Sequence, residues 1–202
     1  MTPYFITGIG TDIGKTIVSA VLTEKLRADY WKPIQSGDLE NSDSIKVGRL
    51  VSNSLTKIHP EGYRLSQPFS PHKSAHLDGL KLDIDSLKLP ITNNRLIIEG
   101  AGGLMVPINE KHYIVDLISH FKAEVILISK NYLGSINHTL LSIELLKNRK
   151  IPIKGIVING ESDPYSEEAI FLHSDLKLIG RIPFAKGLNP DIIRAYGSLL
   201  DI

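Results

Sequence analysis

The stretch Tyr4 to Thr16, YFITGIGTDIGKT, decides the fold of this chain. It opens with a short apolar run, Tyr4 to Ile6, and ends in Gly14-Lys15-Thr16. The residues that follow have apolar side chains at helical spacing. This order predicts a strand, a phosphate-binding loop and a helix, because a glycine-containing loop and a helix N-terminus together point several backbone N–H groups at phosphate oxygens.

The loop departs by one residue from the commonest spacing, G-x-x-x-x-G-K-[ST]. That pattern would place the first glycine at Ile9, whereas here it is Gly8. The chemistry of the ending is intact: we expect Lys15 to reach the β- and γ-phosphate oxygens, and the Thr16 hydroxyl to face a bridging Mg²⁺. A bare Gly-Lys-Thr can also be an ordinary helix start, but the strand before it and the amphipathic helix after it favour a phosphate site.

Composition and charge are those of an ordinary globular protein. The 202 residues predict a single domain, 1–202, with 42% hydrophobic and 22% charged residues. The 23 Lys and Arg residues nearly balance 22 Asp and Glu, so we expect no binding to nucleic acid or to anionic membranes. Because the chain has no cysteine, no apolar run of membrane-spanning length and no visible signal peptide, we expect it to be cytoplasmic.

Apolar runs alternate with helical patterns from residue 95 onwards. Strands are expected at 95–99, 124–129, 154–158 and 177–182, and helices at 113–121, 133–149, 167–172 and 190–200. The alternation predicts an α/β fold with a mostly parallel central sheet flanked by helices on both faces. Ligands of such sheets collect at the C-terminal ends of the strands, where we expect Gly8, Lys32, Glu99, Ser129, Asn159 and Pro183.

The segment between the first helix and residue 95 is less regular. Pro33 and Gly37 are expected to end any regular element, and residues 54–94 to form a surface excursion. The elements expected here are a helix capped by Asn41-Ser42-Asp43 and ending near Asn53, a short strand at Tyr63 to Leu65, and a helix near Asp85. His72 and His76 have helical spacing but no third ligand, and Pro71 disfavours a helix before His72, so we expect no zinc site.

Two acids and one lysine are the best candidates for chemistry beside the loop. A metal bound to a triphosphate needs carboxylate oxygens, which Glu99 at a strand end and Asp43 at a helix start can supply. Each has a plainer explanation, since Asp43 can be a helix N-cap and Glu99 an ordinary acid at a strand end. Lys32 is equally open between a solvated strand end and a functional residue at the ligand-binding edge.

Several further motifs accompany the loop. In chain order they are Trp31-Lys32-Pro33 with Ser36-Gly37, Asn41-Ser42-Asp43, Ser70-Pro71-His72, Glu99-Gly100-Ala101-Gly102-Gly103, Leu133-Gly134-Ser135-Ile136-Asn137-His138, Gly155-Ile156-Val157-Ile158-Asn159 and Gly180-Arg181-Ile182-Pro183. With the loop they resemble the dethiobiotin synthetase family over nearly the whole chain. K-P-x-x-S-G and E-G-A-G-G are the most specific of them, and they imply the architecture of P-loop NTPases.

The resemblance implies an ATP-dependent ring closure in biotin synthesis. Members of this family convert 7,8-diaminopelargonate and CO₂ to a carbamate, phosphorylate it from ATP, and let the second amine displace phosphate to give dethiobiotin. Positive charge is needed to bring the carbamate and the γ-phosphate together. Catalytic roles are implied for Lys32, Lys15 and Thr11, and Mg²⁺ ligation for Thr16, Asp43 and Glu99.

Further residues match positions of the family that bind nucleotide or substrate. Those implied to contact ATP are Asp12, Ile13, Gly14, Lys15, Thr16, Ile17, Asp43, Glu99, Gly100, Ala101, Gly102, Asn159, Gly160, Pro183, Phe184 and Ala185, with Asn159 reading adenine. Those implied to contact substrate are Ser36, Ser135, Ile136 and Asn137. The last three open a helix that is implied to hold the substrate carboxylate across the interface of a homodimer, although Asn137 can also be a simple helix cap.

Other functions of the same fold remain open from the sequence. An ATP-driven partitioning switch usually carries an extra lysine early in the loop, where this chain has Ile9 and Gly10 in place of the threonine and aspartate common in dethiobiotin synthetases. A regulatory ATP-binding domain without activity would not need Lys15, Lys32, Asp43 and Glu99. An amide-forming ligase of the cobyrinate type would need a nucleophilic cysteine, which the chain lacks.

Overall fold

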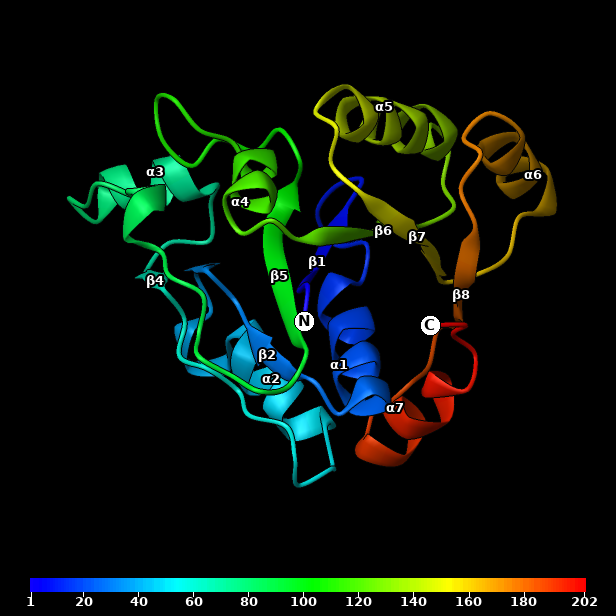
Figure 1. Ribbon diagram of the computed structural model, residues 1–202, viewed down its shortest axis with the longest axis horizontal. Helices are drawn as coiled ribbons and strands as arrows, with labels where there is room; N and C mark the ends of the chain where they lie inside the picture. The colour runs from blue at the N-terminus through cyan, green and yellow to red at the C-terminus, as the bar shows by residue number, and fades with distance from the viewer.

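The computed structural model describes residues 1–202 as a central parallel sheet between two layers of helices (Figure 1). The six strands are in the order β2-β5-β1-β6-β7-β8, and every neighbouring pair is parallel. Their bounds are β1 Tyr4–Gly8, β2 Asp29–Trp31, β5 Leu96–Gly103, β6 Glu124–Ser129, β7 Ile153–Asn159 and β8 Leu178–Ile182. The predicted fold class is therefore confirmed.

Side chains alternate between two cores along the buried strands. Phe5 and Ile98 face the core covered by α4, α5 and α6, whereas Ile6 and Ile97 face the core covered by α1, α2 and α7. Because both faces are covered, the central strands carry continuous apolar runs, such as Leu96 to Ile98 in β5 and Val125 to Ile128 in β6, as the sequence suggested. The helices are α1 Lys15–Leu26, α2 Asp43–Leu50, α3 Pro71–Leu77, α4 Ile114–His120, α5 Ser135–Asn148, α6 Pro164–Leu172 and α7 Pro190–Gly197. None of them is long and apolar enough to cross a membrane.

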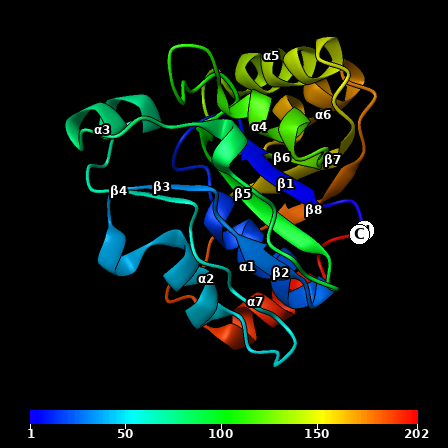
Figure 2. The same cartoon turned by 60° about the vertical axis from the view of Figure 1, so that its left-hand side comes forward.

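Pro33 and Gly37 each lie just beyond a strand, as predicted, because β2 ends at Trp31 and a short strand that the sequence did not predict ends at Ser36. Strand β3, Ile34–Ser36, lies between them and pairs in parallel with β4, Tyr63–Leu65, in a small second sheet at one side of the molecule (Figure 2). Pro33 has no N–H to donate, but its carbonyl accepts the Tyr63 N–H at 2.8 Å. This hydrogen bond attaches the loop after β2 to the surface segment 54–94.

Other boundaries also shifted. The predicted helix near Asp85 is a single 3-10 turn, Ile84–Ser86, whereas α3 begins at Pro71 itself because proline is well suited to the first helical position. Strand β5 continues through Gly103, so Glu99 lies inside the strand with 1% of its surface exposed, and not at its end. Glu99 is thus held by a buried strand.

Candidate functional site

A cavity of about 780 Å³ lies at the C-terminal edge of the sheet, beside the phosphate loop. Its walls come from the loop and the start of α1, from the β2–β3 segment, from the start of α2, from the chain before α3, and from β5. The cavity is lined by Thr11, Asp12, Gly14, Lys15, Thr16, Ile17, Lys32, Gln35, Ser36, Asp38, Asp43, Lys46, Pro68, Phe69, Ser70, Pro71, Glu99, Ala101, Gly102 and Val106. Segments far apart in the sequence thus meet at one site.

The phosphate loop is shaped for an anion. Gly14 has φ of +90°, and a Cβ there would lie 2.0 Å from the Asn159 amide nitrogen, so the position requires glycine. No side chain caps α1, which leaves the N–H groups of its first turn for a ligand. Lys15 Nζ donates to the Gly10 carbonyl at 2.8 Å, and burial lowers the pKa of Lys15 to about 8.

The two residues that replace threonine and aspartate have visible structural roles. Ile9 packs against both apolar cores and donates its N–H to the Ile128 carbonyl at 3.1 Å, which ties the loop to β6. Gly10 supplies the carbonyl that receives Lys15. A Cβ at Gly10 would meet nothing within 4 Å, so no steric constraint demands glycine there.

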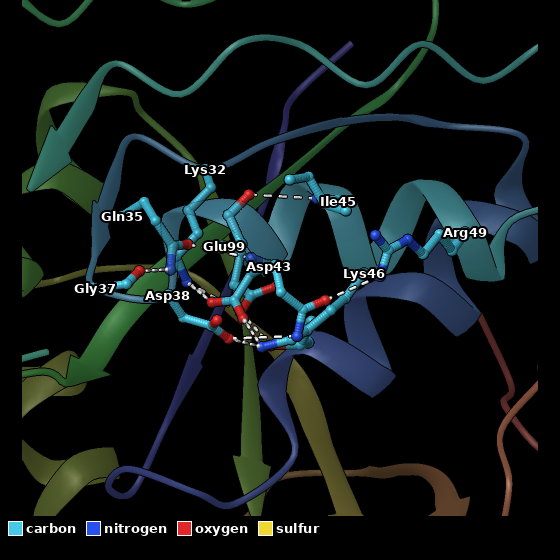
Figure 3. Close-up of polar contacts among 12 residues, drawn as sticks. Lys32, Gln35, Gly37, Asp38, Asp43, Ile45, Lys46, Arg49 and Glu99 are labelled. Atoms are coloured by element: carbon cyan, nitrogen blue, oxygen red, sulfur yellow. Dashed lines mark hydrogen bonds and ion pairs between the residues drawn. The ribbon is translucent and has the colours of Figure 1, made fainter. Parts of the chain in front are cut away.

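A buried lysine between two carboxylates forms the centre of the cavity (Figure 3). Lys32 Nζ lies 2.5 Å from Asp43 Oδ2 and 3.2 Å from Glu99 Oε1. The Thr16 hydroxyl donates to Glu99 Oε1 and the buried Tyr30 hydroxyl donates to Glu99 Oε2, each at 2.9 Å. Both Glu99 oxygens are therefore hydrogen-bonded, which compensates for burying this charge.

These contacts shift the pKa values so that Lys32 stays positively charged, Asp43 stays negatively charged and Tyr30 stays neutral. Burial alone would lower the pKa of Lys32, but the charges of Glu99 and Asp43 outweigh it and raise the pKa above its usual value. Burial would raise the pKa of Asp43, but Lys32 holds it below its usual value. Burial and the neighbouring Glu99 raise the pKa of Tyr30 well above 10, so its phenol remains a donor.

Asp43 lines the cavity and does not cap its own helix. The Ser42 hydroxyl accepts the Ile45 N–H at 3.4 Å, so Ser42 is the N-cap of α2 and the plainer explanation of Asp43 does not hold. Gln35 accepts the Asp43 N–H at 3.2 Å and donates to the Gly37 carbonyl at 2.9 Å. The Gln35 side chain therefore joins Asp43 to the turn after β3.

Many of the residues singled out from the sequence line the cavity. These are Thr11, Asp12, Gly14, Lys15, Thr16, Ile17, Lys32, Ser36, Asp43, Glu99, Ala101 and Gly102. Ile13 and Gly100 lie in the same segments but do not line it. Asn159 reaches the loop from β7, where its amide donates to the Ile13 carbonyl at 2.9 Å.

The remaining predicted residues lie outside this cavity. Gly160, Pro183, Phe184 and Ala185 follow β7 and β8, with Phe184 78% exposed. At the start of α5, Ser135 is buried and its hydroxyl accepts the Tyr132 N–H, whereas Asn137 is exposed. Asn137 does not cap α5, because the capping position is Gly134. Within one chain these two groups are therefore separate from the phosphate cavity.

Sequence reasoning missed several lining residues. Gln35 lies inside the motif K-P-I-Q-S-G, and a polar residue there was the one available signal. The others are Asp38, Lys46, Pro68, Phe69, Ser70, Pro71 and Val106, of which only Ser70 and Pro71 belonged to a quoted motif. Phe69 lies in an irregular segment and is 44% exposed, so no periodic pattern marked it.

The oxygen atoms around Lys32 are suited to Mg²⁺ that arrives with a nucleotide. No group of three or more His, Cys, Asp or Glu side chains is positioned to hold a metal. Asp43, Glu99 and Thr16 supply only hard oxygen donors. Mg²⁺ is usually bound by one or two carboxylates together with waters and substrate phosphates, and this partial set has that character.

Solved structures of similar fold include a plasmid partition protein and the cell-division protein MinD. The plasmid partition protein of Borrelia burgdorferi bound to AMPPNP has a TM-score of 0.57 at 13% identity and covers 98% of this chain and 97% of its own. MinD from Pyrococcus horikoshii complexed with Mg-ADP has a TM-score of 0.53 at 17% identity, with coverage of 98% and 86%. At such identities the likeness shows the P-loop fold alone.

Curated relatives are far more similar in sequence. The model of the family described as "AAA domain" matches residues 2–191. The ATP-dependent dethiobiotin synthetase BioD of Christiangramia forsetii is 53% identical, over 96% of this chain and 94% of its own. That of Cytophaga hutchinsonii is 48% identical, over 99% and 97%. The chain therefore belongs to the ATP-dependent dethiobiotin synthetase family, within the P-loop ATPases.

Proposed function

We propose that this protein is a dethiobiotin synthetase, which joins CO₂ to the two amines of 7,8-diaminopelargonate in an ATP-dependent ring closure. One observation carries the assignment beyond the family match: Lys15, Lys32, Thr16, Asp43 and Glu99, from four separate parts of the chain, surround one cavity. A site that joins two anions needs concentrated positive charge, which the two lysines supply and a Mg²⁺ held by the oxygen ligands would increase.

The reaction has three bond-forming steps. One amine of the substrate adds to CO₂ and loses a proton, giving a carbamate. A carbamate oxygen then attacks the γ-phosphorus and ADP departs. The second amine attacks the carbonyl carbon, phosphate departs, and the cyclic urea closes.

Lys15 and Lys32 stabilise negative charge in the phosphoryl-transfer step. Lys15 releases the Gly10 carbonyl and binds the β- and γ-phosphate oxygens, while the loop N–H groups hold the same phosphates. In the free protein Lys32 is held protonated by its two acid neighbours. In the complex its ammonium would face the carbamate and the transferring group, whose negative charge favours the same charged form. Thr11 and Asp12, both on the cavity wall, adjoin this region.

Mg²⁺ would be held by Thr16, Asp43 and Glu99. When bound, it supplies Lewis-acid neutralisation of the triphosphate. The same carboxylates now neutralise Lys32, so their occupation by another cation would free the lysine for the carbamate.

Ser36 is suited to contact the diamine. Its hydroxyl is buried, lacks a hydrogen-bond partner within the chain, and belongs to a residue that lines the cavity. A buried unsatisfied hydroxyl is costly, and a substrate amine would satisfy it. Phe69 and Val106 offer apolar surface in the same cavity for the methylene chain.

Adenine and the substrate carboxylate would use the two groups outside the cavity. Asn159, Gly160 and residues 183–185 form the base side. A second copy of the chain would present Ser135, Ile136 and Asn137 to the substrate carboxylate, giving a homodimer. Leu133 and Leu141 are 104% and 60% exposed beside this helix start, which suits an interface. We place the reaction in the cytoplasm.

The decisive assay combines the purified protein with ATP, Mg²⁺, bicarbonate and diaminopelargonate. We expect phosphate to appear in step with dethiobiotin, and neither to form without the diamine. Phosphate release that ignores the diamine would refute the synthetase assignment and favour an ATP-driven switch.

A substitution at Lys32 separates its role from nucleotide binding. Lys32→Gln should lower turnover much more than ATP affinity, because the interaction is made mainly in the transition state. Equal losses in both would place Lys32 in simple nucleotide binding.

A further inference from the structure

Another buried acid, Glu167 on α6, contacts the segments that lead to the two groups of predicted contacts outside the phosphate cavity. Glu167 is 2% exposed. Its Oε1 accepts from the Asn131 amide at 2.9 Å, from the Asp163 N–H at 3.1 Å and from the Ser162 hydroxyl at 3.2 Å. Its Oε2 forms an ion pair with the Arg181 guanidinium. A single carboxylate thus receives four donors.

The four donors come from three separate segments of the chain. Asn131 lies in the loop from β6 to α5, Ser162 and Asp163 lie in the loop from β7 to α6, and Arg181 lies in β8. Two further hydrogen bonds connect the same segments. The Asn131 amide also donates to the Glu161 carbonyl at 2.9 Å, and the Gly160 N–H donates to the Ile182 carbonyl at 2.8 Å.

Each of these segments leads directly to residues of the proposed site. The loop from β7 begins with Asn159 and Gly160, and β8 ends at Ile182 immediately before Pro183, all on the base side. The loop from β6 leads through Gly134 to Ser135, where the substrate carboxylate is expected. Figure 1 shows α5 and α6 side by side over the same face of the sheet.

The network depends on the charge of Glu167. Burial would raise its pKa, but hydrogen bonds from Arg181 and Asn131 outweigh burial and hold the pKa below its usual value. The adjacent Glu168 has the same chemistry and the same helix but is exposed to solvent. This pair of neighbours allows a matched comparison.

We propose that Glu167 is a positioning residue that fixes the nucleotide-base loop and the substrate-carboxylate loop relative to each other. The inference rests on the proposed function. Glu167 touches neither ligand and acts through Asn131, Ser162 and Arg181. Loss of its carboxylate should release both loops together, whereas loss of the Arg181 guanidinium should release only the base side.

The principal test compares Glu167→Ala with Glu168→Ala in the full-length enzyme. We expect Glu167→Ala to raise the KM for ATP and the KM for the diamine about tenfold each while kcat changes less than about twofold, because ground-state contacts are lost. Glu168→Ala should leave both constants unchanged. If Glu167→Ala lowers only the melting temperature, or matches Glu168→Ala, the proposal is wrong.

Two milder variants keep the inference testable if Glu167→Ala does not fold. Arg181→Ala should raise the KM for ATP alone. Asn131→Ala should raise the KM for the diamine more than the KM for ATP, because its amide also donates to Glu161 in the base-side loop. If Arg181→Ala and Asn131→Ala changed the KM for ATP and the KM for the diamine equally, Arg181 and Asn131 would not act on different loops. Calorimetric affinity for AMPPNP tests the base-side connection without turnover: it should fall about tenfold in Arg181→Ala. Unchanged AMPPNP affinity would overturn the inference, whereas absence of dethiobiotin with the wild-type protein would overturn only the proposed function.

Discussion

Replacing Lys32 by glutamine tests the charge balance at the centre of the site. The Lys32 side chain is 5% exposed and lies between Asp43, 22% exposed, and Glu99, 1% exposed. Removing one partner of a buried ion pair typically costs about 3–5 kcal/mol, and the partial exposure of Asp43 favours the lower end. At about 2–4 °C per kcal/mol for a domain of this size, the melting temperature should fall by about 6–12 °C in EDTA.

Mg²⁺ without nucleotide should partly reverse this loss. In Lys32→Gln the two carboxylates no longer share an ammonium, so a divalent cation binds them with less competition. Binding to the folded state alone stabilises by mass action, about 2.7 kcal/mol at a hundredfold excess over Kd. Scanning calorimetry with EDTA or Mg²⁺ should therefore show a larger Mg²⁺-dependent rise for Lys32→Gln than for the wild type.

Lys46→Gln is the matched control for this experiment. Lys46 pairs with Asp38 at 2.8 Å and lies 3.9 Å from Asp43, but its side chain is 37% exposed and that of Asp38 is 54% exposed, so it tests an exposed positive charge beside the same acid. Exposed ion pairs contribute about 0–1 kcal/mol, so this variant should melt close to the wild type. The reasoning would be refuted if Lys32→Gln melted within about 2 °C of the wild type in EDTA. It would also be refuted if Mg²⁺ raised the melting temperatures of Lys32→Gln and the wild type equally.

Three further outcomes follow from the same geometry. Lys15 has a pKa of about 8 in the free protein and phosphate favours its charged form, so ATP binding takes up a proton above that pH. Calorimetry from pH 7 to 9.5 should show ATP affinity falling by up to about tenfold per pH unit above 8. An affinity that does not change with pH would contradict this. Tyr30→Phe removes a donor from buried Glu99 and should cost about 2 kcal/mol in urea unfolding, so an unchanged midpoint would be inconsistent with the bond. Gln35→Ala frees both the start of α2 and the Gly37 turn, and steady-state kinetics should show kcat/KM reduced about tenfold, whereas unaltered kinetics would exclude a positioning role for Gln35.

The amino-acid sequence determined the sheet and its ligand-binding edge. Runs such as Leu96 to Ile98 are apolar throughout because both faces of a parallel strand are covered, and this signal is local. The phosphate loop was equally readable, since Gly14, Lys15 and Thr16 act through adjacent backbone and side-chain groups. Lys32, Asp43 and Glu99 were candidates from their expected places at strand and helix ends, the family resemblance gave them roles, and all three line one cavity.

The tertiary structure alone decided which side chains share a partner. The sequence could not tell whether Asp43 or Ser42 caps α2, and only the fold shows that Ser42 does so while Lys32 neutralises Asp43. Glu167 drew no attention at all, because its donors lie between 4 and 36 residues away along the chain. Periodicity reports which face of an element is buried, but a contact between loops depends on how several strands are placed side by side, and that placement exists only in the folded chain.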